Sequence, residues 1–140
     1  MRITVEHILD APIADVWADV SILASHGEWM ADADHVDIVS DIDRGVGTVM
    51  RVPTTVGPLS TEDWIIVTDW VEGSRIGVVH LGTVSGSGMF ELEPRGDRTL
   101  FRWDEELSLP GVLGLFEPIA APVIRAIWAR NLERLGRRFD

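Results

Sequence analysis

The apolar positions of the last thirty residues recur with the spacing of an α-helix. When successive residues are placed 100° apart, one broad face of the segment 109–139 is mostly apolar. Pro118 and Pro122 fall near its start, where a helix tolerates a missing N–H, and arginines crowd its last turns. We therefore predict a long amphipathic helix packed on a sheet, with Asn131, the only asparagine, near the middle of the apolar face. That face consists of Ala120, Val123, Ile124, Ile127, Trp128, Leu132 and Leu135.

The first 35 residues show the pattern of a strand followed by two short helical segments and a loop. Apolar and polar residues alternate over 2–9, which is typical of a half-buried strand. Asp10 is placed to cap a helix that has Pro12 in its first turn. A second helical turn is predicted over 21–24, and the acidic stretch 30–35 is predicted to be a loop. One side of the first strand carries Ile3, Val5, His7 and Leu9.

Six further strands are predicted between the short helices and the long one. Turn-forming residues such as Gly45 and the pair Gly57-Pro58 separate them. Because no connection is long enough for a crossover helix, the sheet is predicted to be an antiparallel meander. The strands cover 36–42, 46–54, 59–71, 75–82, 84–94 and 98–109.

The last two of these strands place a carboxyl group opposite a gap in the sheet surface. On the last strand, Glu105 alternates in phase with Phe101 and Trp103, so its side chain is predicted to lie among apolar neighbours. On the preceding strand, Gly86 and Gly88 share the apolar side. The sheet surface is therefore predicted to be hollow near the two glycines.

Composition and charge limit the classes of function. At 140 residues, nearly half of them apolar, the chain is predicted to be a single domain with its own core. A formal net charge of −11 argues against a general nucleic-acid or anionic-membrane binder. The absence of cysteine excludes disulfides and thiolate chemistry. Since no leader-like segment and no sufficiently long apolar run is present, we expect a soluble, cytoplasmic protein that does not insert into a membrane.

Several short stretches occur in a fixed order along the chain. They are Leu9-Asp10-Ala11-Pro12, Val16-Trp17, Trp29, Gly45-Val46-Gly47, Phe90-Glu91-Leu92-Glu93-Pro94 and Asp97-Arg98-Thr99, and the long C-terminal helix follows them. In this order and spacing they resemble the START-like SRPBCC superfamily, in its polyketide cyclase/dehydrase and lipid-transport branch. The resemblance covers essentially the whole chain, 1–140.

The resemblance implies an α+β helix-grip fold. In such a fold a seven-stranded antiparallel sheet wraps around a long C-terminal helix, and two short helices follow the first strand. It also implies a cavity between the sheet and the helix, in which members bind lipids, polyketides, sterols or other hydrophobic molecules. Some members are cyclases or dehydratases. Because the superfamily has no shared catalytic motif, the resemblance implies a pocket and leaves the reaction open.

Glu105 is the candidate catalytic residue. In a dry cavity, desolvation favours the neutral carboxyl group, which can donate or shuttle a proton in a dehydration or an aldol cyclisation. The alternative is that the last strand carries a bulge or ends early, so that Glu105 reaches solvent beside Glu106.

Three more polar residues are candidates for contacting a ligand. Asn131 has the groups to hydrogen-bond a ligand carbonyl or hydroxyl, or alternatively to be satisfied by a neighbouring strand or water. His7 is predicted to lie near Trp103 or Glu105 if the first and last strands pair, as the resemblance implies, and a His–Glu pair would transfer protons. A satisfied core histidine is the other interpretation of His7, and the same two interpretations apply to His80.

A metal site and a cofactor are not predicted. His26 and His35 bracket an acidic stretch, but the spacing matches no zinc or calcium pattern, so a solvated acidic loop is the better interpretation. The glycines of 82–88 precede neither a lysine nor a helix, so they do not form a phosphate-binding loop. They favour a hairpin with bends in its strands.

The leading functional hypothesis is binding of a small hydrophobic ligand, such as a lipid, polyketide or sterol-like molecule, between the sheet and the helix. The Pro- and Gly-rich run 109–114 is the predicted hinge for ligand access. One alternative is a polyketide cyclase or dehydratase that uses Glu105, and another is a toxin-like or stress-response protein that acts through its surface. The chain is expected to be a monomer or a homodimer. The predicted ligand-binding residues are Trp103, Asn131, Phe90, Phe101, Ile124, Ile127, His7 and His80.

Overall fold

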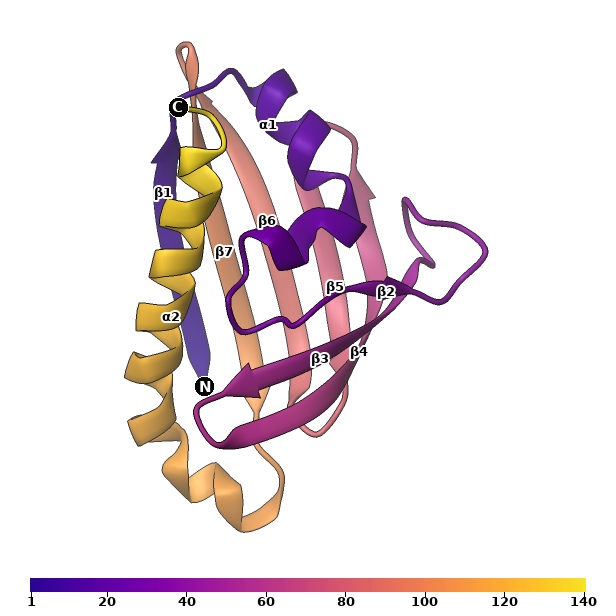
Figure 1. Cartoon of the computed structure of the whole chain (residues 1–140), viewed down its shortest axis with the longest axis vertical. Coiled ribbons are helices and arrows are strands. Elements are labelled where there is room, and N and C mark those ends of the chain that lie inside the picture. Colours follow the sequence, from indigo (N-terminus) through magenta and orange to yellow (C-terminus); the bar gives the residue numbers. More distant parts are fainter.

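The computed structural model describes residues 1–140, apart from the side chain of Val56, and shows a seven-stranded antiparallel sheet with a long C-terminal helix (Figure 1). The strand order in the sheet is β1-β7-β6-β5-β4-β3-β2. The predicted meander, the pairing of the first strand with the last and the α+β helix-grip class are therefore confirmed. The strands are β1 (Arg2–Leu9), β2 (Asp37–Ile38), β3 (Val49–Val56), β4 (Leu59–Val71), β5 (Arg75–Leu81), β6 (Ser85–Arg95) and β7 (Arg98–Ser108).

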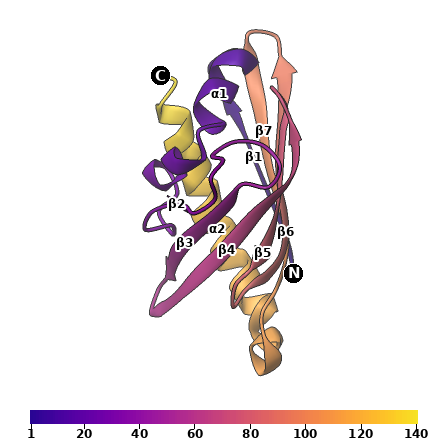
Figure 2. The same cartoon turned by 90° about the vertical axis from the view of Figure 1, so that its right-hand side faces the viewer.

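All the helices lie on the same side of the sheet (Figure 2). The long helix α2 (Glu117–Arg137) runs beside β1 and contacts it. The helix α1 (Ile13–Val20) and the 3₁₀ helix η1 (Leu23–Glu28) lie at the end of the sheet where α2 finishes (Figure 1). A second 3₁₀ helix, η2 (Gly111–Phe116), joins β7 to α2 at the opposite end. The sheet therefore has one covered face, and the space under the helices is where a core or a cavity forms.

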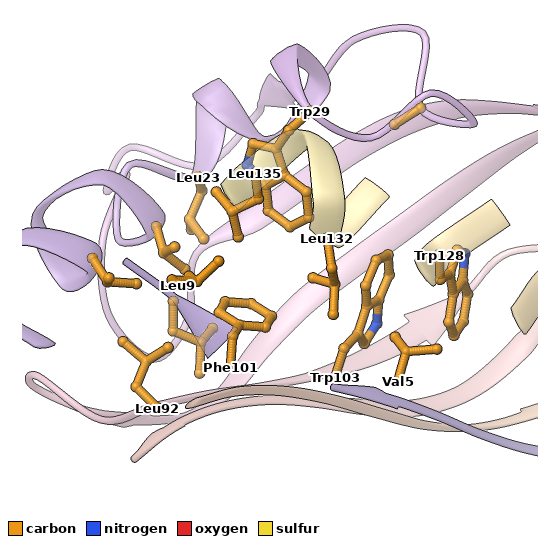
Figure 3. Packing of buried hydrophobic residues seen from close by; sticks show 14 of the residues in the cluster. Val5, Leu9, Leu23, Trp29, Leu92, Phe101, Trp103, Trp128, Leu132 and Leu135 are labelled. Atoms are coloured by element: carbon orange, nitrogen blue, oxygen red, sulfur yellow. The ribbon is translucent and has the colours of Figure 1, made fainter. Parts of the chain in front are cut away.

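The hydrophobic core fills this space near the C-terminal half of α2 (Figure 3). Leu132 and Leu135 of α2 are fully buried, and so are Leu9 of β1 and Phe101 of β7. Trp29, which follows η1, lies edge-on to Phe101 with ring centroids 6.2 Å apart. Each large apolar side chain buried in this way contributes roughly 1.5–3 kcal/mol, so these contacts anchor the last turns of α2.

The N-terminal half of α2 is less buried than the sequence pattern predicts. Val123, assigned to the buried face, is 52% exposed, and Trp128 is the first buried residue of the helix. The reason is that the N-terminal half carries apolar residues on two sides, and only one side faces the sheet. The prediction of a single continuous buried face is wrong for this half.

Three predicted boundaries also differ from the structure. The strand predicted over 36–42 is reduced to the two residues of β2, because positive φ angles at Gly45 (85°) and Gly47 (96°) turn the chain between β2 and β3. The segment before Glu117 is 3₁₀ rather than α-helical, since Gly111 has a φ of 54° and follows a proline. Asp10 does not cap α1, whose N-cap is Pro12, and instead forms an ion pair with Arg98 at 3.4 Å.

Candidate functional site

A cavity of about 180 Å³ lies between the sheet and α2, beyond the packed core. Its wall is predominantly apolar, with aliphatic side chains from β3, β4 and β5 and aromatic side chains from β6, β7 and α2. The wall includes Val78 of β5, Phe90 of β6, Trp103 of β7, and Ile124 and Trp128 of α2. The cavity is the space that remains because α2 contacts the sheet closely only over its C-terminal half.

The predicted wall residues divide between the cavity and the core. Phe90, Trp103 and Ile124 line the cavity. Phe101 is fully buried in the core and lies outside the lining, and Ile127 packs against the same core. Register explains the difference, since Phe101 lies two residues farther from the cavity along β7 than Trp103 does.

Three ionisable side chains meet at one end of the cavity. His80 Nδ1 donates to Asp63 Oδ2 at 2.6 Å, and His80 Nε2 lies 3.1 Å from Glu105 Oε2. The second contact is close enough for an ion pair but is not aligned as a hydrogen bond. All three residues line the cavity, and they come from β4, β5 and β7. We call this group the Asp63–His80–Glu105 cluster.

The cluster forms because the intervening strand has no side chains at this point. Glu105 pairs with Gly88 across β6 and β7, and His80 pairs with Gly86 across β5 and β6. A Cβ atom at Gly88 would lie 2.6 Å from Glu105 Oε1, well inside the normal contact distance. The hollow predicted near the two glycines is therefore filled by the Glu105 side chain, which extends across β6 to reach His80.

Electrostatics keep the imidazole of His80 charged. Burial alone lowers the pKa of His80, but the hydrogen bond to Asp63, the close contact with Glu105 and the negative charges of both groups outweigh burial and raise this pKa to about 10. Two carboxyl groups thus flank one imidazolium at this end of the cavity. Asp63 Oδ1 has no hydrogen-bond donor among the described residues. This end of the cavity is therefore rich in oxygen atoms that can accept hydrogen bonds.

Two stacked indoles form the wall next to the cluster. The rings of Trp103 and Trp128 lie 4.3 Å apart between centroids and are inclined by only 9°. Trp103 Nε1 donates to Glu105 Oε1 at 3.0 Å, and Trp128 Nε1 donates to Asp32 Oδ2 at 3.1 Å. Since each indole N–H is satisfied, the flat faces of the rings remain as apolar surface.

Asn131 holds a loop rather than facing the cavity. Its side chain is fully buried and accepts from the backbone N–H of Ala31 at 2.9 Å. Its amide nitrogen donates to Asp32 Oδ1 at 2.8 Å. Asn131 is outside the cavity lining, whereas Asp32 is part of it. The Asn131 amide is thus satisfied by the loop after η1, whereas the alternative drawn from the sequence was a neighbouring strand or water.

The expected proximity of His7 and Glu105 is wrong. The two strands do pair, but the register places His7 opposite Phe101 and Glu105 opposite Ile3. His7 and Glu105 are therefore four residues apart along the sheet, roughly 13 Å at 3.3 Å per residue. His7 lies against α2 instead, where a Cβ atom at Gly136 would come within 3.1 Å of its Nε2 atom.

The two remaining histidines are separated by the fold. His26 is buried in the cavity wall, where its Nε2–H donates to the carbonyl of Val20 at 2.7 Å, and burial lowers its pKa. His35 is exposed and lies 3.2 Å from Asp37. Within the part of the chain that the structure describes, no three His, Asp or Glu side chains are placed to hold a metal ion.

Asp63 and Asp32 contribute to the site but were not predicted from the sequence. For Asp63 a signal was present, because it alternates in phase with Thr61, Ile65 and Val67 along β4 and so shares their side of the sheet. For Asp32 the sequence held no such signal, since it lies in an acidic loop whose path depends on contacts with α2.

The family is shown by the match of the whole chain to a family model. Residues 1–140 match the family described as "Polyketide cyclase / dehydrase and lipid transport", so the chain belongs to this family. The resemblance drawn from the short sequence stretches is thereby confirmed. No curated protein matches the chain in sequence.

Solved structures share the fold at low sequence identity. TTHA0849 from Thermus thermophilus has a TM-score of 0.81 at 17% identity, over 99% of this chain and 97% of that protein. A START superfamily protein from Mycobacterium smegmatis has a TM-score of 0.79 at 17% identity, over 99% and 96%. The ZhuI aromatase/cyclase from Streptomyces sp. R1128 has a TM-score of 0.69 at 16% identity, over 98% and 89%. At these identities the likeness shows the fold alone.

Proposed function

We propose that this protein binds a small hydrophobic ligand in the cavity between its sheet and α2. The observation that carries the proposal is a mostly apolar cavity, walled by stacked indoles, with a few convergent polar groups at one end. Such a site gains affinity from apolar burial and orientation from its polar groups. Membership in a family described as cyclase, dehydrase and lipid transport agrees with this role.

The volume limits the size of the ligand. An engineered protein cavity of about 150 Å³ holds one benzene molecule. At about 180 Å³, this cavity has room for a small ring system or part of one acyl chain. A sterol needs a volume several times larger, so a ligand of that size would require α2 or the 109–114 run to move outward. We therefore favour a ligand with one or two rings.

The cluster at the end of the cavity selects the polar group of the ligand. Because the side chains of Asp63 and Glu105 line the cavity and supply acceptor oxygens, a ligand hydroxyl or amine fits better there than a carboxylate, which has no hydrogen to donate. The proposed ligand is thus an apolar ring compound with a hydrogen-bond donor at one end.

A pair of matched variants tests the proposal. Val78 lines the cavity, whereas its neighbour Val79 lies on the other face of β5 and does not. Fluorescence titration with the two-ring probe 1-naphthylamine, which carries a hydrogen-bond donor, should show saturable binding by the wild type and by Val79→Phe. Val78→Phe should lower the affinity at least tenfold, because its ring occupies the cavity. Equal binding by all three proteins would contradict a ligand site in this cavity.

A cyclase or dehydratase is the second candidate function, since Glu105 lies in the cavity wall next to a charged imidazole. In this role Glu105 would accept a proton from the substrate, while His80 would stabilise the carboxylate. His80 itself keeps its proton at neutral pH, because its pKa is about 10, so it is a poor general base. This favours binding over proton transfer. Glu105→Gln separates the two functions: an enzyme loses turnover but still binds its ligand, whereas a binding protein changes only its affinity.

A further inference from the structure

The outer face of α2 carries a stripe that is apolar in its first half and cationic in its second. Ile119 and Val123 are 68% and 52% exposed, and they point to the same side of the helix as Arg130, Arg134 and Arg137, which recur at spacings of three, four or seven residues. The preceding η2 extends the apolar half with further exposed side chains. These are Val112 (75%), Leu113 (46%), Leu115 (80%) and Phe116 (53%).

The arginines of this stripe differ from those elsewhere in the chain. The twelve basic residues are all arginines, and eight of them form ion pairs with carboxylates. The remaining four have no acidic partner among the described side chains: Arg125, Arg130, Arg134 and Arg137 of α2. A chain with a net charge of −11 therefore gathers its unneutralised positive charge on one helix.

The apolar half of the stripe lies at the end of the molecule where the cavity lining includes an exposed residue. That residue is Thr83, in the connection between β5 and β6. This connection, the β3–β4 connection and η2 all lie at the same end of the molecule (Figure 1). Leu59 and Leu81, which border these connections, are 67% and 58% exposed. Exposed apolar side chains from three separate segments thus lie at the same end as this part of the cavity wall.

Composition alone would also allow α2 to cross a bilayer, but its packing does not. The segment Gly111–Arg137 is long and apolar enough to span a membrane, so the expectation that the chain has no such run is wrong. However, Trp128, Leu132 and Leu135 of the same segment are buried in the core, so a transmembrane position would require the domain to unfold. A helix with a basic face and an exposed apolar portion lies on a bilayer rather than across it.

We propose that η2 and the outer face of α2 dock on an anionic lipid bilayer. The apolar side chains of 112–123 enter the boundary between headgroups and acyl chains, and Arg130, Arg134 and Arg137 contact lipid phosphates. The net negative charge of the chain predicts repulsion from an anionic bilayer. However, screening limits charge interactions to about 8 Å at physiological salt, so the cationic face of α2 that touches the bilayer determines the sign of the interaction. Docking in this orientation brings this end of the cavity wall toward the lipid surface. It does not require an occupied cavity, and so it goes beyond the proposed ligand binding.

Vesicle cosedimentation of the purified protein tests this inference. Vesicles contain phosphatidylcholine either alone or with about 30% phosphatidylglycerol, and binding is expected only with the anionic lipid. The double variant Arg130→Gln/Arg134→Gln should weaken binding about 25-fold, because each arginine near an anionic surface contributes roughly fivefold. Leu115→Ser/Ile119→Ser should weaken it at least as much.

Control variants remove arginines or an apolar side chain from surfaces outside η2 and α2. Arg95→Gln/Arg98→Gln removes two charges at the β6–β7 turn, and Val46→Ser removes an apolar side chain that is 60% exposed between β2 and β3. Both should leave vesicle binding within about twofold of the wild type. No binding by the wild type, or equal loss in the controls, would overturn the proposal. A dimer in analytical ultracentrifugation that Leu115→Ser/Ile119→Ser dissociates would also overturn it, because a second copy would then cover the face.

Discussion

Glu105 of β7 and His80 of β5 form an ion pair across the strand that separates them, with His80 Nε2 3.1 Å from Glu105 Oε2. Side chains on strands two positions apart seldom meet, because neighbouring strands are about 4.8 Å apart and the middle strand places its own side chains between them. Here the middle strand presents Gly86 and Gly88. The ion pair is therefore a direct consequence of two glycines in the sequence.

A side chain at position 88 in place of Gly88 should break the Glu105–His80 ion pair. Gly88→Ala places a Cβ atom 2.6 Å from Glu105 Oε1, so the carboxylate must move away from His80 or from Trp103. We expect a loss of about 1–3 kcal/mol in the free energy of unfolding, measured in urea. Gly114→Ala is the control, because its Cβ would meet its neighbours at an ordinary 3.6 Å. Equal stability of the two variants would show that Glu105 is free to relocate.

The charge of His80 makes stability depend on pH in an alkaline range. In the unfolded chain His80 loses its proton near pH 6.5, whereas in the folded chain its pKa is about 10. Between these values the folded state holds one more proton, so stability falls as pH rises, by up to about 1.4 kcal/mol per pH unit.

The difference in unfolding free energy between the wild type and His80→Gln isolates this effect. It should be largest at pH 6.5 and below, and it should shrink as the pH approaches about 10. Val79→Ala, which removes no ionisable group from the same strand, should show no such trend. A difference that stays constant across this pH range would mean that His80 is neutral in the folded protein.

The bonds between Asn131 and the loop after η1 should be essential for stability. Asn131→Leu leaves the buried N–H of Ala31 without an acceptor and removes one donor from Asp32. We expect a loss of about 2–4 kcal/mol in the free energy of unfolding. The neighbouring exposed substitution Glu133→Ala should change stability by less than about 0.5 kcal/mol. If Asn131→Leu were as stable as the wild type, the loop would be held by other contacts, such as the Trp128–Asp32 bond.

The strands and their two faces could be predicted because period-2 alternation is a local property. It placed Glu105 inward and put Gly86 and Gly88 on the same side, whereas the pairing of the first and last strands was implied by the family resemblance. The same alternation indicates that Asp63 points to the covered side of the sheet. These residues are positioned by their own strand and its immediate neighbours.

Register, loops and helix placement could not be predicted in the same way. The distance between His7 and Glu105 depends on how two strands distant in sequence align, and a shift of a few residues decides it. The partner of Asn131 lies 100 residues earlier, in a loop without a periodic pattern. The exposure of Val123 depends on which apolar side of α2 faces the sheet, and helical periodicity does not decide between two apolar sides.

Native mass spectrometry of the protein, as purified and after addition of 1-naphthylamine, tests the central claim most directly. We expect one bound molecule per chain, either co-purified or taken up from the added probe, and its loss in Val78→Phe but not in Val79→Phe. A wild-type protein that remains at the bare chain mass under all these conditions would contradict a ligand-binding cavity between the sheet and α2.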